Sequence, residues 1–158
     1  MPDPPRRSVR VADERLARAA AIGDGFAFEA LMRRHESAAY RVAVRMLGRS
    51  ADAEEAVQDA FVAAWRALPG FRGQSRFSTW MHRITVNRCL TVIAGRRPLA
   101  APLSGAEADP GHGPLEAAAA REGTRAVTAA IECLTPEQRA PFVLRELEGL
   151  SYDEIGEV

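Results

Sequence analysis

Apolar residues recur at steps of three or four along most of the chain, which is the periodicity of amphipathic α-helices. One long stripe runs through residues 27–47, with Phe28 and Leu31 near its start and Gly48 after its end. A shorter helix is expected before it, and the Asp13 side chain is placed to accept hydrogen bonds from the free N–H groups at its start. The pattern predicts an all-α fold.

Two further helices are predicted in the first half of the chain. The first opens at about residue 50, has an apolar stripe, and closes at Pro69-Gly70. Residues 71–76 have no period and predict a loop. A helix over 78–94 follows, with Gly95 as its expected C-cap.

A change of composition separates two predicted domains. Residues 98–114 contain four prolines and three glycines, which is typical of a flexible linker. Beyond it an Ala-rich helical stretch leads to two capping boxes, Thr135-Pro-Glu-Gln138 and Ser151-Tyr-Asp-Glu154, each of which starts a helix. The expected organisation is a flexible tail at 1–11, a helical domain at 12–97, the linker at 98–114 and a second helical domain at 115–158.

Length and composition exclude several classes of protein. The chain has 158 residues, 47% of them apolar, which suits one soluble domain or two small ones. No apolar run approaches the ~18 residues of a membrane span, and the start has no signal-like apolar stretch, so a cytoplasmic protein without a membrane partner is expected. Cys89 and Cys133 lack ligand spacing, which argues for free thiols rather than a disulfide or a metal site.

The net charge of zero conceals a basic middle segment. Residues 1–59 carry ten arginines and ten acids, residues 60–106 carry seven arginines and no acid, and residues 107–158 carry four arginines and eleven acids. An acid-free stretch of this length in an acid-rich chain favours a polyanionic partner.

Two sets of residues are candidate binding surfaces, and each set also has a purely structural interpretation. Asp52, Glu55 and Asp59 share one helix face opposite the apolar stripe, where they suit a basic partner or simply form a solvated face. In the basic segment, arginines alternate with Phe77 and Trp80, which suits a single nucleic-acid strand because guanidinium groups hold phosphates and rings stack on bases. The alternative is that these rings belong to the core.

The order of several motifs resembles one protein family. DAEEAVQDAFVAAW at 52–65, FRGQSRFSTWMHRI at 71–84 and Asn87 are similar to region two of the extracytoplasmic-function sigma factors. TPEQR at 135–139 and LRELEGLSYDEI at 144–155 are similar to the first part of their region four. The resemblance covers roughly residues 25–97 and 115–158.

The resemblance implies a bacterial transcription initiation subunit that binds core RNA polymerase and recognises and melts the minus-10 promoter element on its non-template strand. The family's docking helix binds the clamp coiled coil of the largest polymerase subunit; the matching residues here are Asp52, Glu55, Gln58, Asp59 and Phe61. The matching residues for a flipped-base pocket are Arg76, Phe77, Ser78 and Thr79. Those for the strand or its phosphates are Arg83, Asn87, Arg88, Arg96 and Arg97, while Trp80 matches an aromatic that packs or stacks.

Two departures limit what is carried over. Thr91 stands where many members have Asp, so promoter preference is not transferred. The sequence ends at Val158, before the recognition helix that enters the major groove in the family, so as given it is expected not to read the minus-35 element.

Other classes of function fit the sequence less well. A helical module that binds polymerase or an anti-sigma factor without opening a promoter is the main alternative, and the family implies an anti-sigma partner. The spacing of the three histidines and the lack of nucleophile or phosphate-loop motifs argue against catalytic residues, a metal, a cofactor or a small-molecule substrate. A membrane-surface role is disfavoured because the arginines do not share one amphipathic face.

Overall fold

The computed structural model describes residues 4–95, 129–131 and 133–156, and every regular element in these ranges is helical. The prediction of an all-α fold is confirmed. The predicted linker at 98–114, the residues 115–128 and the candidate site residues Arg96 and Arg97 lie outside the described residues. In chain order the labelled elements are α1 (Pro4–Ala21), α2 (Gly25–Leu47), α3 (Ser50–Ala67), the 3-10 turn η1 (Leu68–Gly70), α4 (Phe77–Gly95), α6 (Pro136–Glu148) and α7 (Tyr152–Gly156).

Helices α2 and α3 form an antiparallel pair. Gly48 ends α2 in the left-handed conformation, with φ of 72°, and its N–H donates to the Val44 carbonyl. The chain then reverses, so that Phe28 near the start of α2 meets Trp65 near the end of α3 at 4.9 Å between ring centroids. The face of α3 that packs inward is largely alanine, because small side chains let neighbouring helices approach closely.

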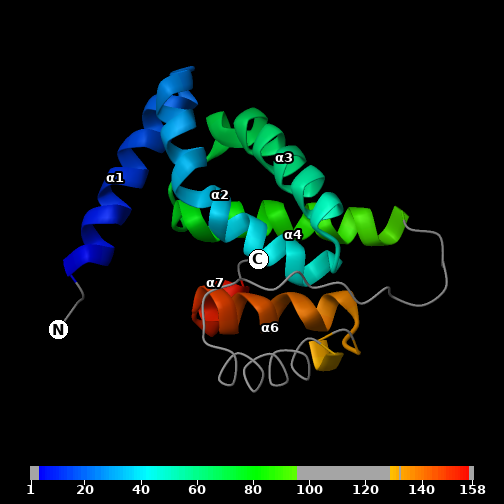
Figure 1. The fold of residues 1–158 in the computed structure, drawn as a ribbon. Coiled ribbons are helices and arrows are strands. Elements are labelled where there is room, and N and C mark those ends of the chain that lie inside the picture. The colour runs from blue at the N-terminus through cyan, green and yellow to red at the C-terminus, as the bar shows by residue number, and fades with distance from the viewer. Residues whose placement is uncertain (1–3, 96–128, 132, 157–158) are drawn as a thin grey trace, which may run out of the picture.

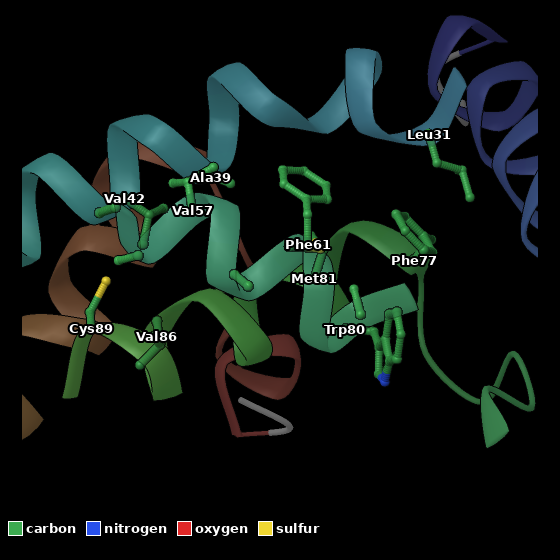
Figure 2. Packing of buried hydrophobic residues seen from close by; sticks show 14 of the residues in the cluster. Leu31, Ala39, Val42, Val57, Phe61, Phe77, Trp80, Met81, Val86 and Cys89 are labelled. Carbon is green, nitrogen blue, oxygen red and sulfur yellow. The ribbon is translucent and has the colours of Figure 1, made fainter. Parts of the chain in front are cut away.

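Helix α4 is covered by helices from both ends of the chain. It packs against α2 and α3 and also against α6, which buries residues around most of its circumference. Phe77, Met81 and Cys89 lie in the shared core, as Figure 2 shows together with the residues they meet from α2 and α3. The predicted C-cap Gly95 is the last residue of the helix itself.

Helix α1 begins earlier than the sequence predicted. It starts at Pro4, within the segment 1–11 that was expected to be a tail, since prolines in a first helical turn lack only N–H groups that have no partner there. Asp13 is therefore inside the helix and does not cap it. Its buried carboxylate instead accepts a hydrogen bond from Arg34 at 2.8 Å and lies 2.9 Å from His35 Nε2.

The two predicted capping boxes form in the structure, one at the start of α6 and one at the start of α7. Thr135 Oγ1 accepts from the Gln138 N–H, and the Gln138 side chain accepts from the Thr135 N–H, which completes a capping box at the start of α6. Gly149 ends α6 in the left-handed conformation. Ser151 and Glu154 form the same reciprocal pair at the start of α7.

The C-terminal helices pack directly against the N-terminal bundle. Ala140, Val143, Leu144 and Leu150 belong to the same buried cluster as the core residues of α2 and α4. Figure 1 shows α6 and α7 beneath α2 and α4, although 107 residues separate Arg41 of α2 from its partner Glu148 of α6. The sequence left the relative placement of the two predicted domains open, and the structure puts them in contact.

Candidate functional site

The loop before α4 is held in place by aromatic packing. Phe71 lies 4.9 Å from Trp80 and 6.0 Å from Phe77 between ring centroids, so the loop that follows it is anchored on the first turn of the helix. Gly73 takes a positive φ of 68° and allows the chain to turn. The Arg76 carbonyl accepts the Trp80 N–H at 3.0 Å, which sets Arg76 at the entrance of α4.

Phe77 and Trp80, the two rings that alternate with arginines at the start of α4, lie in the core. Phe77 is 2% exposed and Trp80 7% exposed, and Phe77 points toward Leu31 of α2 (Figure 2). Thr79 is buried as well, whereas Ser78 and Arg88 are partly exposed. The groups presented to solvent are those of Arg76, Arg83 and Asn87. In this arrangement the rings shape the start of α4, and guanidinium and amide groups form its surface.

A small cleft opens between the start of α4 and the C-terminal helices. Its volume is about 180 Å³. The lining residues come from both halves of the chain: His35, Ala38, Arg76, Ser78, Thr79 and His82 on one side, and Glu148, Gly149, Leu150 and Glu154 on the other. Three of the four residues expected to form a base pocket, Arg76, Ser78 and Thr79, are therefore brought together here.

His82 is a buried titratable group in the wall of this cleft. Burial, helped by the neighbouring charges of His35 and Arg41, lowers the pKa of His82 to about 4. Its Nδ1 has no hydrogen-bond partner among the described residues, and its Nε2 lies 3.9 Å from Glu148 Oε2. The imidazole is accordingly neutral at neutral pH.

Ion pairs connect the N-terminal bundle to the C-terminal helices at and beside the cleft, and no sequence pattern predicts them. Arg41 donates from Nε and Nη2 to the two carboxylate oxygens of Glu148, each at 3.1 Å. Arg76 Nη1 lies 3.2 Å from Glu154 Oε1. Burial raises the pKa of Glu148 even though Arg41 pulls it the other way. Glu154 was recognisable in the sequence only as a capping residue, because pairs this far apart in the chain leave no periodic signal.

The acidic face of α3 is presented away from the core. Glu55, Gln58 and Asp59 are exposed, and Asp52 is partly exposed with Arg49 at 3.9 Å. Phe61 differs from the other residues of the predicted docking set. It is only 6% exposed and its ring points toward α2, where it meets Phe28 edge to face at 6.4 Å (Figure 2).

Other kinds of site find no support in the part of the chain that the structure describes. Within residues 4–95, 129–131 and 133–156 no group of three or more His, Cys, Asp or Glu side chains is arranged to hold a metal ion. The described helices also include none that is long and apolar enough to cross a membrane. Cys89 is buried and Cys133 exposed, and both are free thiols.

Comparison with known proteins connects this geometry to a family. The model of Sigma-70 region 2 matches residues 31–98, which include α3, the loop and α4, and the model of Sigma-70, region 4 matches residues 124–158. The ECF RNA polymerase sigma-E factor of Escherichia coli K12 is 34% identical over 96% of this chain and 84% of its own length. The chain belongs to the extracytoplasmic-function sigma factors. RNA polymerase sigma-H factor of Pseudomonas aeruginosa is 32% identical over 92% of this sigma factor and 81% of its own length.

A solved structure agrees with this assignment. The structure of CnrH in complex with the cytosolic domain of CnrY aligns with a TM-score of 0.67 and 30% identity, over 92% of this sigma factor and 80% of that chain. The two helical domains thus correspond to sigma regions 2 and 4. As a member of this family the sigma factor is a DNA-binding regulator of transcription initiation, which implies RNA polymerase and promoter DNA as partners.

Proposed function

We propose that this sigma factor binds core RNA polymerase through the acidic face of α3 and uses the loop and α4 to recognise and melt the minus-10 promoter element. The observation that carries the proposal is the division of the bundle surface. Exposed carboxylates lie along α3, and the exposed arginine and amide groups lie along a separate helix, α4. A basic partner on α3 and an acidic partner on α4 can therefore bind the molecule at the same time.

The polymerase contact is assigned to Asp52, Glu55, Gln58 and Asp59. These side chains share one helix face, so they can meet a single basic helix pair such as the clamp coiled coil of the largest polymerase subunit. Electrostatic complementarity of this kind speeds association and fixes register. Phe61 supports the face from inside, because its ring packs between α3 and α2.

The promoter contact is assigned to the cleft and to the exposed side of α4. Arg76, Ser78 and Thr79 offer a guanidinium and two hydroxyls in a cleft of about 180 Å³, which suits part of a base taken out of the duplex. Phe77 and Trp80 hold the helix start on which these groups sit. Beyond them Arg83, Asn87 and Arg88 follow along α4, and Arg96 and Arg97 follow in sequence; arginines neutralise phosphates and an amide reads a base edge.

Charge reversal on α3 tests the docking contact. Asp59→Arg is expected to reduce binding of core polymerase at least tenfold, because a basic partner would face a like charge. Circular dichroism should stay unchanged since Asp59 is exposed. Glu36→Arg, which reverses an exposed acid on α2, is the matched control and should bind polymerase normally. Equal binding by Asp59→Arg and wild type would make the acidic row a merely solvated face.

A substitution on α4 tests base recognition separately. Asn87→Ala should lower initiation from promoters that carry one particular minus-10 base and leave others unaffected, because losing one good base contact costs about 1–3 kcal/mol only where that base is present. Runoff transcription from a set of single-base promoter variants measures this. A uniform loss across the whole set would mean that Asn87 has a structural role.

A second function is favoured by one comparison. CnrH was solved together with the cytosolic domain of CnrY, so a related sigma factor is known in a complex with another protein. The alternative function for this chain is a helical module that binds polymerase or an anti-sigma factor without opening DNA. Polymerase binding without initiation, in the transcription experiment above, would favour the module.

A further inference from the structure

His35 of α2 lines the cleft to which we assign the promoter base, although it belongs to neither the loop nor α4. Its side chain is 12% exposed, so most of the imidazole is packed and a small part remains open. Ala38, about one helical turn further along α2, lines the same cleft with only a methyl group. A base that enters the cleft therefore meets this histidine.

Groups from three helices hold the imidazole of His35 in one orientation. Oδ2 of Asp13 in α1 lies 2.9 Å from Nε2 of the ring. The Phe77 ring of α4 lies 5.1 Å from the imidazole between centroids. Asp13 is itself fixed, because its other oxygen accepts a hydrogen bond from Arg34 at 2.8 Å. A ring held in this way is preorganised, which is what a residue that recognises a ligand by hydrogen bonding requires.

Asp13 also fixes which ring nitrogen of His35 carries the hydrogen. Burial would raise the pKa of Asp13, but hydrogen bonds from His35 and Arg34 outweigh it and lower that pKa, so the group is a carboxylate at neutral pH. A carboxylate only accepts hydrogen bonds, so Nε2 donates. In a neutral imidazole the other nitrogen, Nδ1, then has a lone pair. His35 therefore offers a ligand an acceptor, whereas Arg76 in the same cleft offers donors.

This combination of groups matches two of the four DNA bases. A base taken out of a duplex is recognised through hydrogen bonds to its Watson–Crick edge. Adenine and cytosine carry an amino group on that edge, beside a ring nitrogen that accepts. The amino group suits the lone pair of His35, and the accepting atoms suit Arg76 and the hydroxyls of Ser78 and Thr79. Thymine and guanine place a carbonyl oxygen where the amino group would be, and an oxygen is repelled by a lone pair.

We propose that His35 reads a promoter base and that Asp13 is its positioning residue, so that together they select a flipped base with an exocyclic amino group, adenine or cytosine, at one minus-10 position. The inference rests on the proposed function, because it requires the cleft to receive a promoter base. It extends base recognition to α1 and α2, beyond the loop and α4.

The test deletes the amino group from the DNA and the ring nitrogens from the protein. Full-length protein with core polymerase binds labelled forked promoter DNA whose minus-10 non-template strand is single-stranded. Purine replaces adenine, or pyrimidin-2-one replaces cytosine, at one position at a time, and fluorescence anisotropy gives each dissociation constant. His35→Phe keeps a flat ring beside Phe77. Glu36→Gln, which changes the exposed neighbour outside the cleft, is the matched control.

Wild-type protein and the control are expected to bind about fivefold to tenfold more weakly when the amino group is deleted at one position, since one hydrogen bond is lost. His35→Phe should bind both DNAs equally at that position and keep any sensitivity at the others. Each ratio compares two DNAs with one protein preparation, so partial unfolding of a variant does not imitate the result. The same ratio for His35→Phe and wild type would overturn the inference.

Asp13→Asn tests the positioning role. An amide can present either its oxygen or its NH₂ group to Nε2, so it no longer fixes the hydrogen on that nitrogen. The ratio between the amino-bearing and amino-lacking DNA should fall toward one at the same position as in His35→Phe. Loss of stability with an unchanged ratio would show that Asp13 only ties α1 to α2, and the positioning role would be overturned.

Runoff transcription with wild-type protein is measured in parallel, so that the two proposals can fail separately. If the protein supports initiation but no amino group on the strand is sensed through His35, the base-reading role fails and the proposed function stands. If the protein with core polymerase neither initiates nor binds the forked DNA, the proposed function fails and the base-reading role fails with it.

Discussion

Two buried titratable side chains show how single residues act in ways that periodicity does not predict. Burial alone raises the pKa of Asp13, but hydrogen bonds from His35 and Arg34 outweigh it, so the net pKa is lowered. Asp13 is therefore charged at neutral pH and ties α1 to α2. Among the residues that the structure describes, Nδ1 of His82 has no hydrogen-bond partner, and burial keeps this imidazole neutral. The sequence alone does not indicate whether such a histidine or carboxylate is charged or neutral in the folded protein.

The burial of His82 gives the protein an acid-sensitive stability. Between about pH 6.5 and 4 the unfolded chain binds a proton at this position and the folded chain does not, so the free energy of unfolding falls as pH falls through that window. From pH 7 to 5 the loss is expected to be about 2 kcal/mol. His82→Phe should lack this part of the loss, as measured by urea unfolding at both pH values.

The comparison between the two proteins isolates the histidine. Glu148 has a raised pKa, so protonation of that carboxyl in the folded state acts in the opposite direction, and it is present in wild type and variant alike. Parallel pH profiles for the two proteins would show that His82 does not titrate with folding.

At the scale of elements, local sequence signals determine where a helix begins, and tertiary contacts determine which neighbours it packs against. The capping boxes of α6 and α7 form as predicted, because each is closed by residues three positions apart. Helix α4 is different, since its apolar residues surround most of the helix and do not say which neighbour each side contacts. Its sequence identifies a helix, and only the packed structure shows that α6 as well as α2 and α3 covers it.

Helix α6 offers a matched pair of substitutions for its packing. Leu144 is 1% exposed and lies in the shared core, whereas Phe142 on the same helix is 41% exposed. Leu144→Ala is expected to lower the free energy of unfolding by about 2–5 kcal/mol, because it leaves a cavity. Phe142→Ala should have a much smaller effect, and chemical denaturation measures both. Equal losses would mean that α6 is not docked as described.

At the scale of the whole molecule, charge is segregated by segment and then brought together by the fold. The acid-free segment 60–106 supplies Arg76, and the acidic segment 107–158 supplies Glu148 and Glu154. Opposite charges from distant segments thus meet across one cleft. A neutral chain becomes a molecule whose basic surface is partly covered by its own carboxylates.

The remaining basic surface gives a measurable salt dependence. Binding of a labelled single-stranded 20-mer DNA of mixed sequence should weaken as the salt concentration rises. Arg83→Ala/Arg88→Ala should make the slope of log K against log salt shallower by about 1.4, since each phosphate contact on a single strand contributes about 0.7. Arg15→Ala/Arg18→Ala, which removes the same charge from the exposed side of α1, is the control and should leave the slope unchanged. Identical slopes for all three proteins would exclude α4 from phosphate contact.

The sequence by itself determined the helices of α2 to α4, the caps of α6 and α7, and the family resemblance, because these depend on residues close together along the chain. It did not determine that α1 starts at Pro4 or that Asp13 pairs with α2. Least of all did it reveal the contact between Arg41 and Glu148, which are 107 residues apart. Such pairs form only when packing brings distant segments together, so they are determined by the tertiary structure.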